Sequence, residues 1–188
     1  MKFEKIILGV DPGTTIMGYG IIGVIAKKAT LIAMGHIDLT KISGHYAKLK
    51  HIFERSSALI ANYKPDELAI EAPFLDKNVQ VAIKLGRAQG TVMIAALNQN
   101  IPIYEYAPLK IKMALTGNGQ ASKEQVAGML QQIFKIEKMP SKLDATDGLA
   151  AAYCHFIQPE YTKGKSSAKS WADFVKKNPN RIKGGFKK

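Results

Sequence analysis

A short apolar run that ends on an acid is the feature that most constrains this chain. Residues Ile6 to Val10 are apolar, Asp11 follows them directly, and Pro12-Gly13 comes next. An apolar run of this length, bounded by a turn signal, predicts a buried strand. An ionised carboxylate is costly to bury unless it meets a cation or several donors. Asp11 therefore needs a metal ion, a basic side chain or backbone amides, and the alternative is an Asp that only caps its own turn.

The order of the remaining elements predicts an α/β fold. After the first strand we expect strands at 17–26, 29–39, 67–71 and 101–106, and helices at 45–63, 79–98, 109–115, from Ser122 onward, and at 142–157. The first three strands are joined by short turns, which predicts an antiparallel meander. Helices and strands then alternate, which favours parallel pairing. We therefore expect a five-stranded mixed sheet, three antiparallel strands then two parallel, with helices on both faces.

Charge is the unusual property of the composition. The chain has 27 Lys and Arg against 15 Asp and Glu, a formal net charge of +12. From Tyr161 onward there are nine Lys and Arg and one acid, Asp173. We therefore expect a globular domain at 1–158 and a basic, flexible tail at 159–188. Such a charge favours a polyanionic partner, either nucleic acid or an anionic membrane surface.

Targeting signals and cysteine content favour a cytoplasmic protein. No apolar run is long enough to span a membrane, and the five-residue run after Lys5 is too short for a secretory signal. Cys154 is the single cysteine of the sequence, so no intrachain disulfide forms. We expect a cytoplasmic protein with no membrane partner.

Three further acids give Asp11 a set of partners. Glu71 also ends an apolar strand, and it lies beside Asp11 if the first and fourth strands are neighbours. Asp147 interrupts the apolar stripe of the last helix, and Asp144 lies one turn before it. Each helix acid has a simpler reading as a helix N-terminal residue, and this reading explains Asp144 better than Asp147.

Four carboxylates without histidine or thiolate predict a site for hard cations, Mg²⁺ or Mn²⁺. A pair of such ions suits phosphodiester hydrolysis, because one lowers the pKa of the attacking water and the other stabilises the leaving oxygen. A basic protein with an acidic metal site indicates a nuclease.

The helix at 79–98 is apolar on nearly all sides and has small residues four apart at Ala82, Gly86 and Gly90. Interior glycines cost a helix about 1 kcal/mol each relative to alanine, so this spacing favours close packing against another helix. We expect one side of this helix to pack on the sheet and the other on a second copy of the chain. The alternative is a central helix that the same chain covers on both sides.

Several motifs taken together resemble the RuvC family of bacterial Holliday junction resolvases, in the ribonuclease H-like superfamily. The resemblance runs from about Ile6 to Ile157. It is carried by Gly9-Val10-Asp11-Pro12-Gly13, Tyr19-Gly20, Ala69-Ile70-Glu71 with Phe74, Lys84 to Gly90, and Asp144 to Ala150. It implies a ribonuclease H-like fold and a homodimer that cuts two opposed strands of a four-way DNA junction, using two Mg²⁺ ions per subunit, with Mn²⁺ as a substitute.

The resemblance also assigns roles to residues of this chain. It implies that Asp11, Glu71, Asp144 and Asp147 are the catalytic metal ligands. Phe74 matches an aromatic residue that engages bases, and Lys112 and Lys123 match lysines that approach the cleaved strands; their alternatives are a loop anchor and solvated helix surface. Ala82, Gly86 and Gly90 fall on the family's dimer interface. The RuvA and RuvB branch-migration proteins are implied partners.

Two alternatives use the same motifs. Gly9 to Thr15 is also similar to the first phosphate loop of actin and Hsp70-type nucleotide-binding proteins. Those proteins need a duplicated domain and a second Gly-rich loop, for which 188 residues leave no room. The second alternative is a related protein, either a junction-binding module without catalysis or a ribonuclease H-like nuclease of another specificity, including one that acts on RNA.

Overall fold

The computed structural model describes residues 2–73, 78–140 and 142–158. Within these residues the chain forms five strands and five helices. The strands are β1 (Lys5–Asp11), β2 (Ile16–Ile25), β3 (Lys28–Asp38), β4 (Glu67–Glu71) and β5 (Ile103–Tyr106). The helices are α1 (His45–Tyr63), α2 (Val79–Leu97), α3 (Pro108–Thr116), α4 (Lys123–Phe134) and α5 (Asp144–Ile157). The division into a domain at 1–158 and a basic tail at 159–188 stays a prediction, because the tail lies outside the described residues.

The strands form one mixed sheet in the order β3-β2-β1-β4-β5. β2 pairs antiparallel with both β1 and β3, whereas β4 pairs parallel with both β1 and β5. The predicted arrangement, three antiparallel strands and then two parallel ones, is confirmed. In the register of β1 and β4, Val10 lies opposite Ile70, so Asp11 and Glu71 leave neighbouring strands at the same end of the sheet.

Element boundaries differ from the prediction by one or two residues at several ends. The first hairpin turns at Ala26 and Lys27, which have φ angles of 47° and 60°, so Lys28 already belongs to β3. A two-residue turn with positive φ at both positions matches the twist of the strands it joins. The predicted turn at Lys27-Lys28 was wrong by one residue. The last helix begins at Asp144 and not at Lys142.

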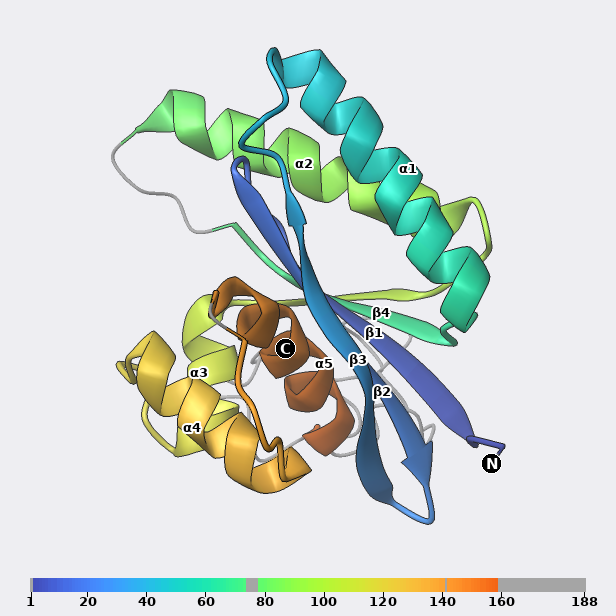
Figure 1. The fold of residues 1–188 in the computed structure, drawn as a ribbon, viewed down its shortest axis with the longest axis vertical. Helices are drawn as coiled ribbons and strands as arrows, with labels where there is room; N and C mark the ends of the chain where they lie inside the picture. Colours follow the sequence, from blue (N-terminus) through green and yellow to red (C-terminus); the bar gives the residue numbers. More distant parts are fainter. Residues whose placement is uncertain (1, 74–77, 141, 159–188) are drawn as a thin grey trace, which may run out of the picture. The chain divides into compact units, whose positions relative to one another are not determined.

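Helices cover both faces of the sheet (Figure 1), with α1 and α2 on one face and α3, α4 and α5 on the other. The sheet has a hydrophobic core on each face, and neighbouring residues of β1 pack into different cores because strand side chains alternate between faces. Leu8 packs in the core under α1 and α2 with Ile52 and Val92, and Ile7 packs in the core under α5 with Leu149. In the described part of the chain, no helix is both long and apolar enough to cross a membrane.

Glycines let α5 lie directly on the backbone of β1 and β2. A Cβ atom at Gly9 would lie 2.2 Å from the carbonyl oxygen of Gly148, and one at Gly20 would lie 2.3 Å from the Cα of Leu149. A Cβ at Gly148 would in turn lie 2.4 Å from the Cα of Tyr19. All three distances are far below an ordinary van der Waals contact. The absence of side chains at these positions therefore sets how closely α5 approaches the sheet.

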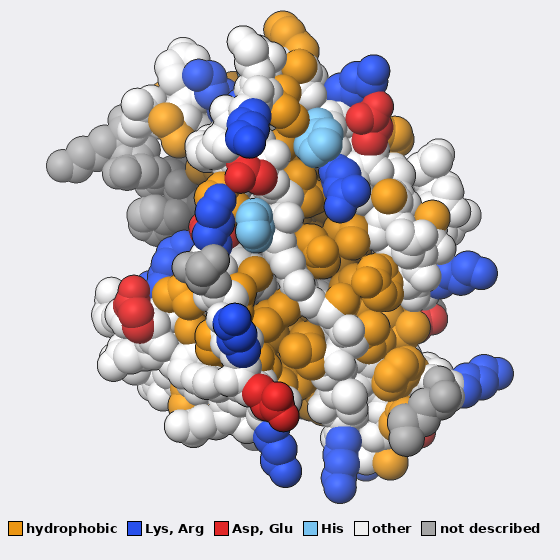
Figure 2. All heavy atoms as spheres, in the orientation of Figure 1, with side chains coloured by type: hydrophobic (Ala, Val, Ile, Leu, Met, Phe, Trp, Pro, Cys, Tyr) orange, Lys and Arg blue, Asp and Glu red, His pale blue; other side chains and the backbone are white. Residues whose placement is uncertain are grey.

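Charged side chains do not form one patch on the face drawn in Figure 2. Hydrophobic side chains gather in the centre of this face, and Lys and Arg side chains are spaced around it. This face therefore offers no single basic patch for a polyanionic partner.

Candidate active site

Asp11 and Glu71 lie at the carboxyl ends of β1 and β4, where the sheet changes from antiparallel to parallel pairing. The strands end there because Pro12 and Pro73 follow within two residues, and proline cannot donate to a sheet ladder. Sites in α/β sheets form at such strand ends. Asp11 and Glu71 therefore lie at the same end of neighbouring strands, as predicted.

Asp144 and Asp147 lie in the first turn of α5. This turn is held by Thr146, whose backbone and hydroxyl groups both donate to the carbonyl oxygen of Leu143, at 2.7 and 2.6 Å. Gly18 of β2 allows the backbone of Asp144 to approach the strand, because a Cβ there would overlap the Asp144 carbonyl oxygen. The N-terminus of α5 therefore sits against the sheet end that carries Asp11.

Lys123, the first residue of α4, pairs with the acids of α5. Its Nζ donates to Asp147 Oδ2 at 2.6 Å and lies 3.9 Å from Asp144 Oδ1. Ser122 and Gln125 form a capping box, which fixes the start of α4. Lys112 of α3 acts on Glu71 and Asp147 through its charge.

The acids raise one another's pKa. Burial, followed by the carboxylates of Asp147 and Asp144, raises the pKa of Asp11 to about 7, against the opposing charge of Lys123. Burial, followed by the carboxylates of Asp11 and Asp147, raises the pKa of Glu71 to about 8. The pKa of Asp147 is also raised, mainly by burial, although its hydrogen bond from Lys123 works in the other direction. Burial and mutual repulsion therefore both disfavour the ionised form of these acids.

The donor chemistry fits a hard divalent cation, because the converging side chains are all carboxylates and repel each other. In residues 2–73, 78–140 and 142–158, however, no three acidic, histidine or cysteine side chains stand ready as a metal-ligand group. One reason is visible in the structure: Asp147 is engaged by Lys123. A metal ion would have to draw the carboxylates together and displace that ammonium.

Long-range contacts that the sequence did not predict hold two loops beside the site. Lys48 of α1 donates to the carbonyl oxygen of Thr14 at 3.0 Å, and the backbone of Leu39 donates to that of Thr15 at 2.9 Å. Asp38, at the end of β3, pairs with Lys142 just before α5 at 3.2 Å. These contacts join residues 34 and 104 positions apart in the sequence, and no local pattern indicates them.

The remaining predicted residues are one that the structure does not describe and three on α2. Phe74 lies outside the described residues. Ala82, Gly86 and Gly90 lie on α2, where a Cβ added at Gly86 or Gly90 meets nothing within 4 Å. The glycine side of α2 is thus open within the described residues, and the choice between a second copy of the chain and cover by the same chain stays a prediction.

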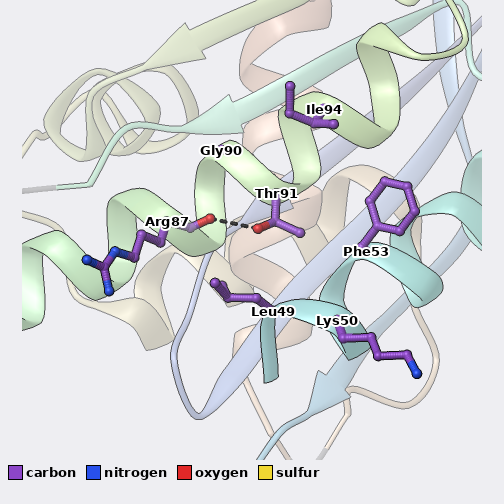
Figure 3. Close-up of a pocket in the computed structure, with 7 residues that line it drawn as sticks. All are labelled: Leu49, Lys50, Phe53, Arg87, Gly90, Thr91 and Ile94. Carbon is purple, nitrogen blue, oxygen red and sulfur yellow. Dashed lines mark hydrogen bonds between the residues drawn. The ribbon is translucent and has the colours of Figure 1, made fainter. Parts of the chain in front are cut away.

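A shallow groove runs between the outer sides of α1 and α2. Figure 3 shows its lining side chains, of which Leu49, Lys50 and Phe53 come from α1 and Arg87, Gly90, Thr91 and Ile94 from α2. None of the four acids lines it. The groove belongs to the open surface of α2 and not to the candidate active site.

A second buried polar network lies under α5. Glu67 accepts from Lys5 at 2.9 Å, and its other oxygen lies 2.8 Å from His155 Nε2. His155 Nδ1 lies 2.6 Å from the hydroxyl of Tyr106. Burial lowers the pKa of His155, although Glu67 partly opposes the shift. This network ties the last turns of α5 to β1, β4 and β5.

Known proteins with a similar sequence are nucleases. A family model for the crossover junction endodeoxyribonuclease RuvC matches residues 7–155. The chain belongs to the RuvC family. A RuvC of Bacteroides fragilis is 64% identical over 185 residues, covering 96% of this chain and 97% of the relative. A RuvC of Christiangramia forsetii is 59% identical, covering 97% and 95%. As a RuvC family member, the chain is an endodeoxyribonuclease, of a kind that is generally metal-dependent.

Solved structures of Holliday junction resolvases share the fold. The structure of Thermus thermophilus RuvC in complex with Holliday junction substrate superposes with a TM-score of 0.74 at 31% identity, covering 81% of this chain and 93% of that one. A yeast mitochondrial Holliday junction resolvase has a TM-score of 0.58 at 11% identity, which shows the fold alone. The ribonuclease H-like fold is confirmed, and the family assignment selects the nuclease over the actin and Hsp70-type alternative.

Proposed function

We propose that this protein resolves four-way DNA junctions in recombination and repair by nicking two opposed strands symmetrically. The observation that carries the proposal is the meeting of acids from β1, β4 and α5 at one end of the sheet, with raised pKa values for Asp11 and Glu71. Membership of the RuvC family supports it, as does the Thermus thermophilus relative bound to a Holliday junction substrate.

Asp11, Glu71, Asp144 and Asp147 would hold two Mg²⁺ ions, with Mn²⁺ able to substitute. Ions at this place would supply an activated water and stabilise the leaving oxygen of the DNA backbone. The protein itself contributes the placement of the acids. Burial under α5 keeps bulk water from solvating them, which strengthens their attraction for a cation.

Lys112 and Lys123 would contact phosphates of the cleaved strands. An ammonium group supplies charge without reading the base, so these contacts position the DNA and do not select a sequence. Phe74, next to the site in sequence, would engage bases near the junction centre. The basic tail at 159–188 would add affinity through its charge.

The open side of α2 would pair with a second copy of the chain. Exposed apolar residues gather on α2, with Val79 65%, Ile94 58% and Leu97 55% exposed. A side chain at Gly86 has open space around it in one chain. Gly86→Glu should therefore leave the fold stable and shift the molar mass measured by light scattering from a dimer to a monomer. A Gly86→Glu protein that stays dimeric would contradict this interface.

The RuvA and RuvB branch-migration proteins are the partners that the resemblance implies. The proposal for the nuclease itself does not depend on them, since the four acids and both lysines belong to one chain.

The deciding experiment is cleavage of a synthetic mobile junction and of linear duplex, each with and without Mg²⁺. We expect paired symmetric nicks in the junction alone and only with Mg²⁺. Asp11→Asn should abolish cleavage and retain junction binding, and its fold should be at least as stable as the wild type at pH 8 because a repelling charge is gone. Asp66→Asn is the matched control, since it makes the same chemical change beside Ile6, at the other end of β1. Cleavage by Asp11→Asn in Mg²⁺ would contradict the metal site.

A further inference from the structure

Lys123 occupies the place where the candidate site needs a cation. Its ammonium donates to Asp147 at 2.6 Å and lies 3.9 Å from Asp144. Its charge also acts on Asp11 and Glu71, where it opposes the rise of both pKa values. One lysine thus serves as a counter-ion for acids from β1, β4 and α5.

The pair with Asp147 competes with metal binding at that carboxylate. The side chain of Asp147 is 13% exposed, so it has little freedom to serve two cations in different directions. A charge-assisted hydrogen bond of this length is among the stronger polar contacts in proteins. Binding of a divalent cation through Asp147 therefore has to break or weaken this contact.

The ammonium of Lys123 can leave without any change in the fold. Its side chain is 56% exposed and stands on a flexible four-carbon stem. The backbone of Lys123 is fixed separately by the capping box of Ser122 and Gln125. A DNA phosphate next to the site would offer the ammonium a second anion, and the released Asp147 would then be free for a metal ion.

We propose that Lys123 competes with the metal ion for Asp147. A DNA phosphate draws the Lys123 ammonium away from Asp147, so metal and junction bind cooperatively. The inference rests on the proposed function. By thermodynamic linkage the coupling is reciprocal: junction DNA tightens metal binding by the same factor by which metal tightens junction binding. The free enzyme would then bind metal weakly and acquire it together with its substrate.

Calcium binding to the free protein tests the competition directly. Ca²⁺ is a hard cation with oxygen ligands and serves as the probe in calorimetry. We expect Lys123→Met and Lys123→Gln to bind Ca²⁺ about three- to tenfold more tightly than the wild type, a modest factor because Lys123 is exposed and screened. Lys112→Met is the matched control: it removes the same charge near Glu71 and Asp147 but breaks no hydrogen bond to them.

The coupling is measured as the affinity for a fluorescent four-way junction by anisotropy, with and without Ca²⁺, with the recovered DNA checked for cleavage. The ratio of junction affinity with Ca²⁺ to junction affinity without Ca²⁺ should be smaller in both Lys123 variants than in the wild type. The decrease should equal the factor by which the variant binds Ca²⁺ more tightly in the absence of DNA. Lys112→Met should keep the wild-type ratio. Unchanged Ca²⁺ affinity in the Lys123 variants, or an equal gain in Lys112→Met, would overturn the inference while leaving metal-dependent cleavage intact. No metal binding by any variant, with or without DNA, would overturn the proposed function as well.

Discussion

The close approach of α5 to β1 makes Gly9→Ala a sharp test of how the acids are positioned. The added Cβ would lie 2.2 Å from the carbonyl oxygen of Gly148 and 2.4 Å from the backbone nitrogen of Ala152. Both are backbone atoms of α5, so no side-chain rotation can make room. Ordinary contacts begin near 3.4 Å, and α5 must therefore move away from the sheet by about 1 Å.

The displacement should reduce both stability and turnover. Overpacking in a well-packed core costs about 1–3 kcal/mol, and we expect the upper end because two backbone atoms are struck. For a chain of this size that lowers the melting temperature by roughly 6–12 °C. The same movement carries Asp144 and Asp147 away from Asp11, and a misplacement of about 1 Å in an active site can lower kcat about 100-fold.

Urea denaturation and single-turnover cleavage of a mobile junction measure the two effects. Gly128→Ala is the control, because a Cβ at this interior position of α4 meets nothing within 4 Å, and it should stabilise the protein by about 0.5–1 kcal/mol. A Gly9→Ala protein with the unfolding midpoint and kcat of the wild type would refute the idea that glycine contacts set the position of the acids.

Three further predictions concern charge and polar contacts. The folded-state pKa of Glu71 is raised from 4.5 to about 8, so the metal-free protein should lose stability as pH rises through this window. The Glu71→Gln protein should lose less stability over the same window. Equal urea midpoints for the two proteins at pH 5.5 and at pH 8.5 would contradict this. His155→Leu removes the hydrogen bonds to Glu67 and Tyr106 and should lower the free energy of unfolding, measured in urea, by about 1–3 kcal/mol. His155→Gln should lower it by less. An unchanged free energy of unfolding in His155→Leu would count against a stabilising role of this network. Removing residues 161–188, with nine Lys and Arg, should flatten the dependence of junction affinity on salt, and an unchanged slope would indicate that the tail does not bind DNA.

The sequence was most informative where a local pattern decides the structure. The apolar runs that end at Asp11 and Glu71 predicted two buried strands, and α1 has the predicted bounds of His45 and Tyr63. A helix from Ser122 onward was also predicted, and α4 begins at Lys123 with Ser122 as its N-cap. In each case the residues that determine the element lie within a few positions of each other, so spacing alone is sufficient evidence.

Contacts between distant segments could not be predicted in this way. Lys123 was expected at a phosphate, and the structure shows it on Asp147, 24 positions away. The pairs of Lys48 with Thr14 and of Lys142 with Asp38 depend on how loops meet after folding. Gly18 and Gly20 on one face of β2 give a sequence signal for close packing, but the helix that packs there, α5, begins only at Asp144, more than a hundred residues further along the chain.

The acids come from segments far apart in the sequence, with Asp11 on β1 and Asp144 and Asp147 on α5. During synthesis the sheet end with Asp11 and Glu71 emerges from the ribosome long before α5 does. A nascent or truncated chain that lacks α5 therefore has an incomplete set of acids and leaves the apolar face of β1 and β2 uncovered. In the proposed metal site, cutting activity would therefore arise only when α5 docks, in the same step that completes the described fold.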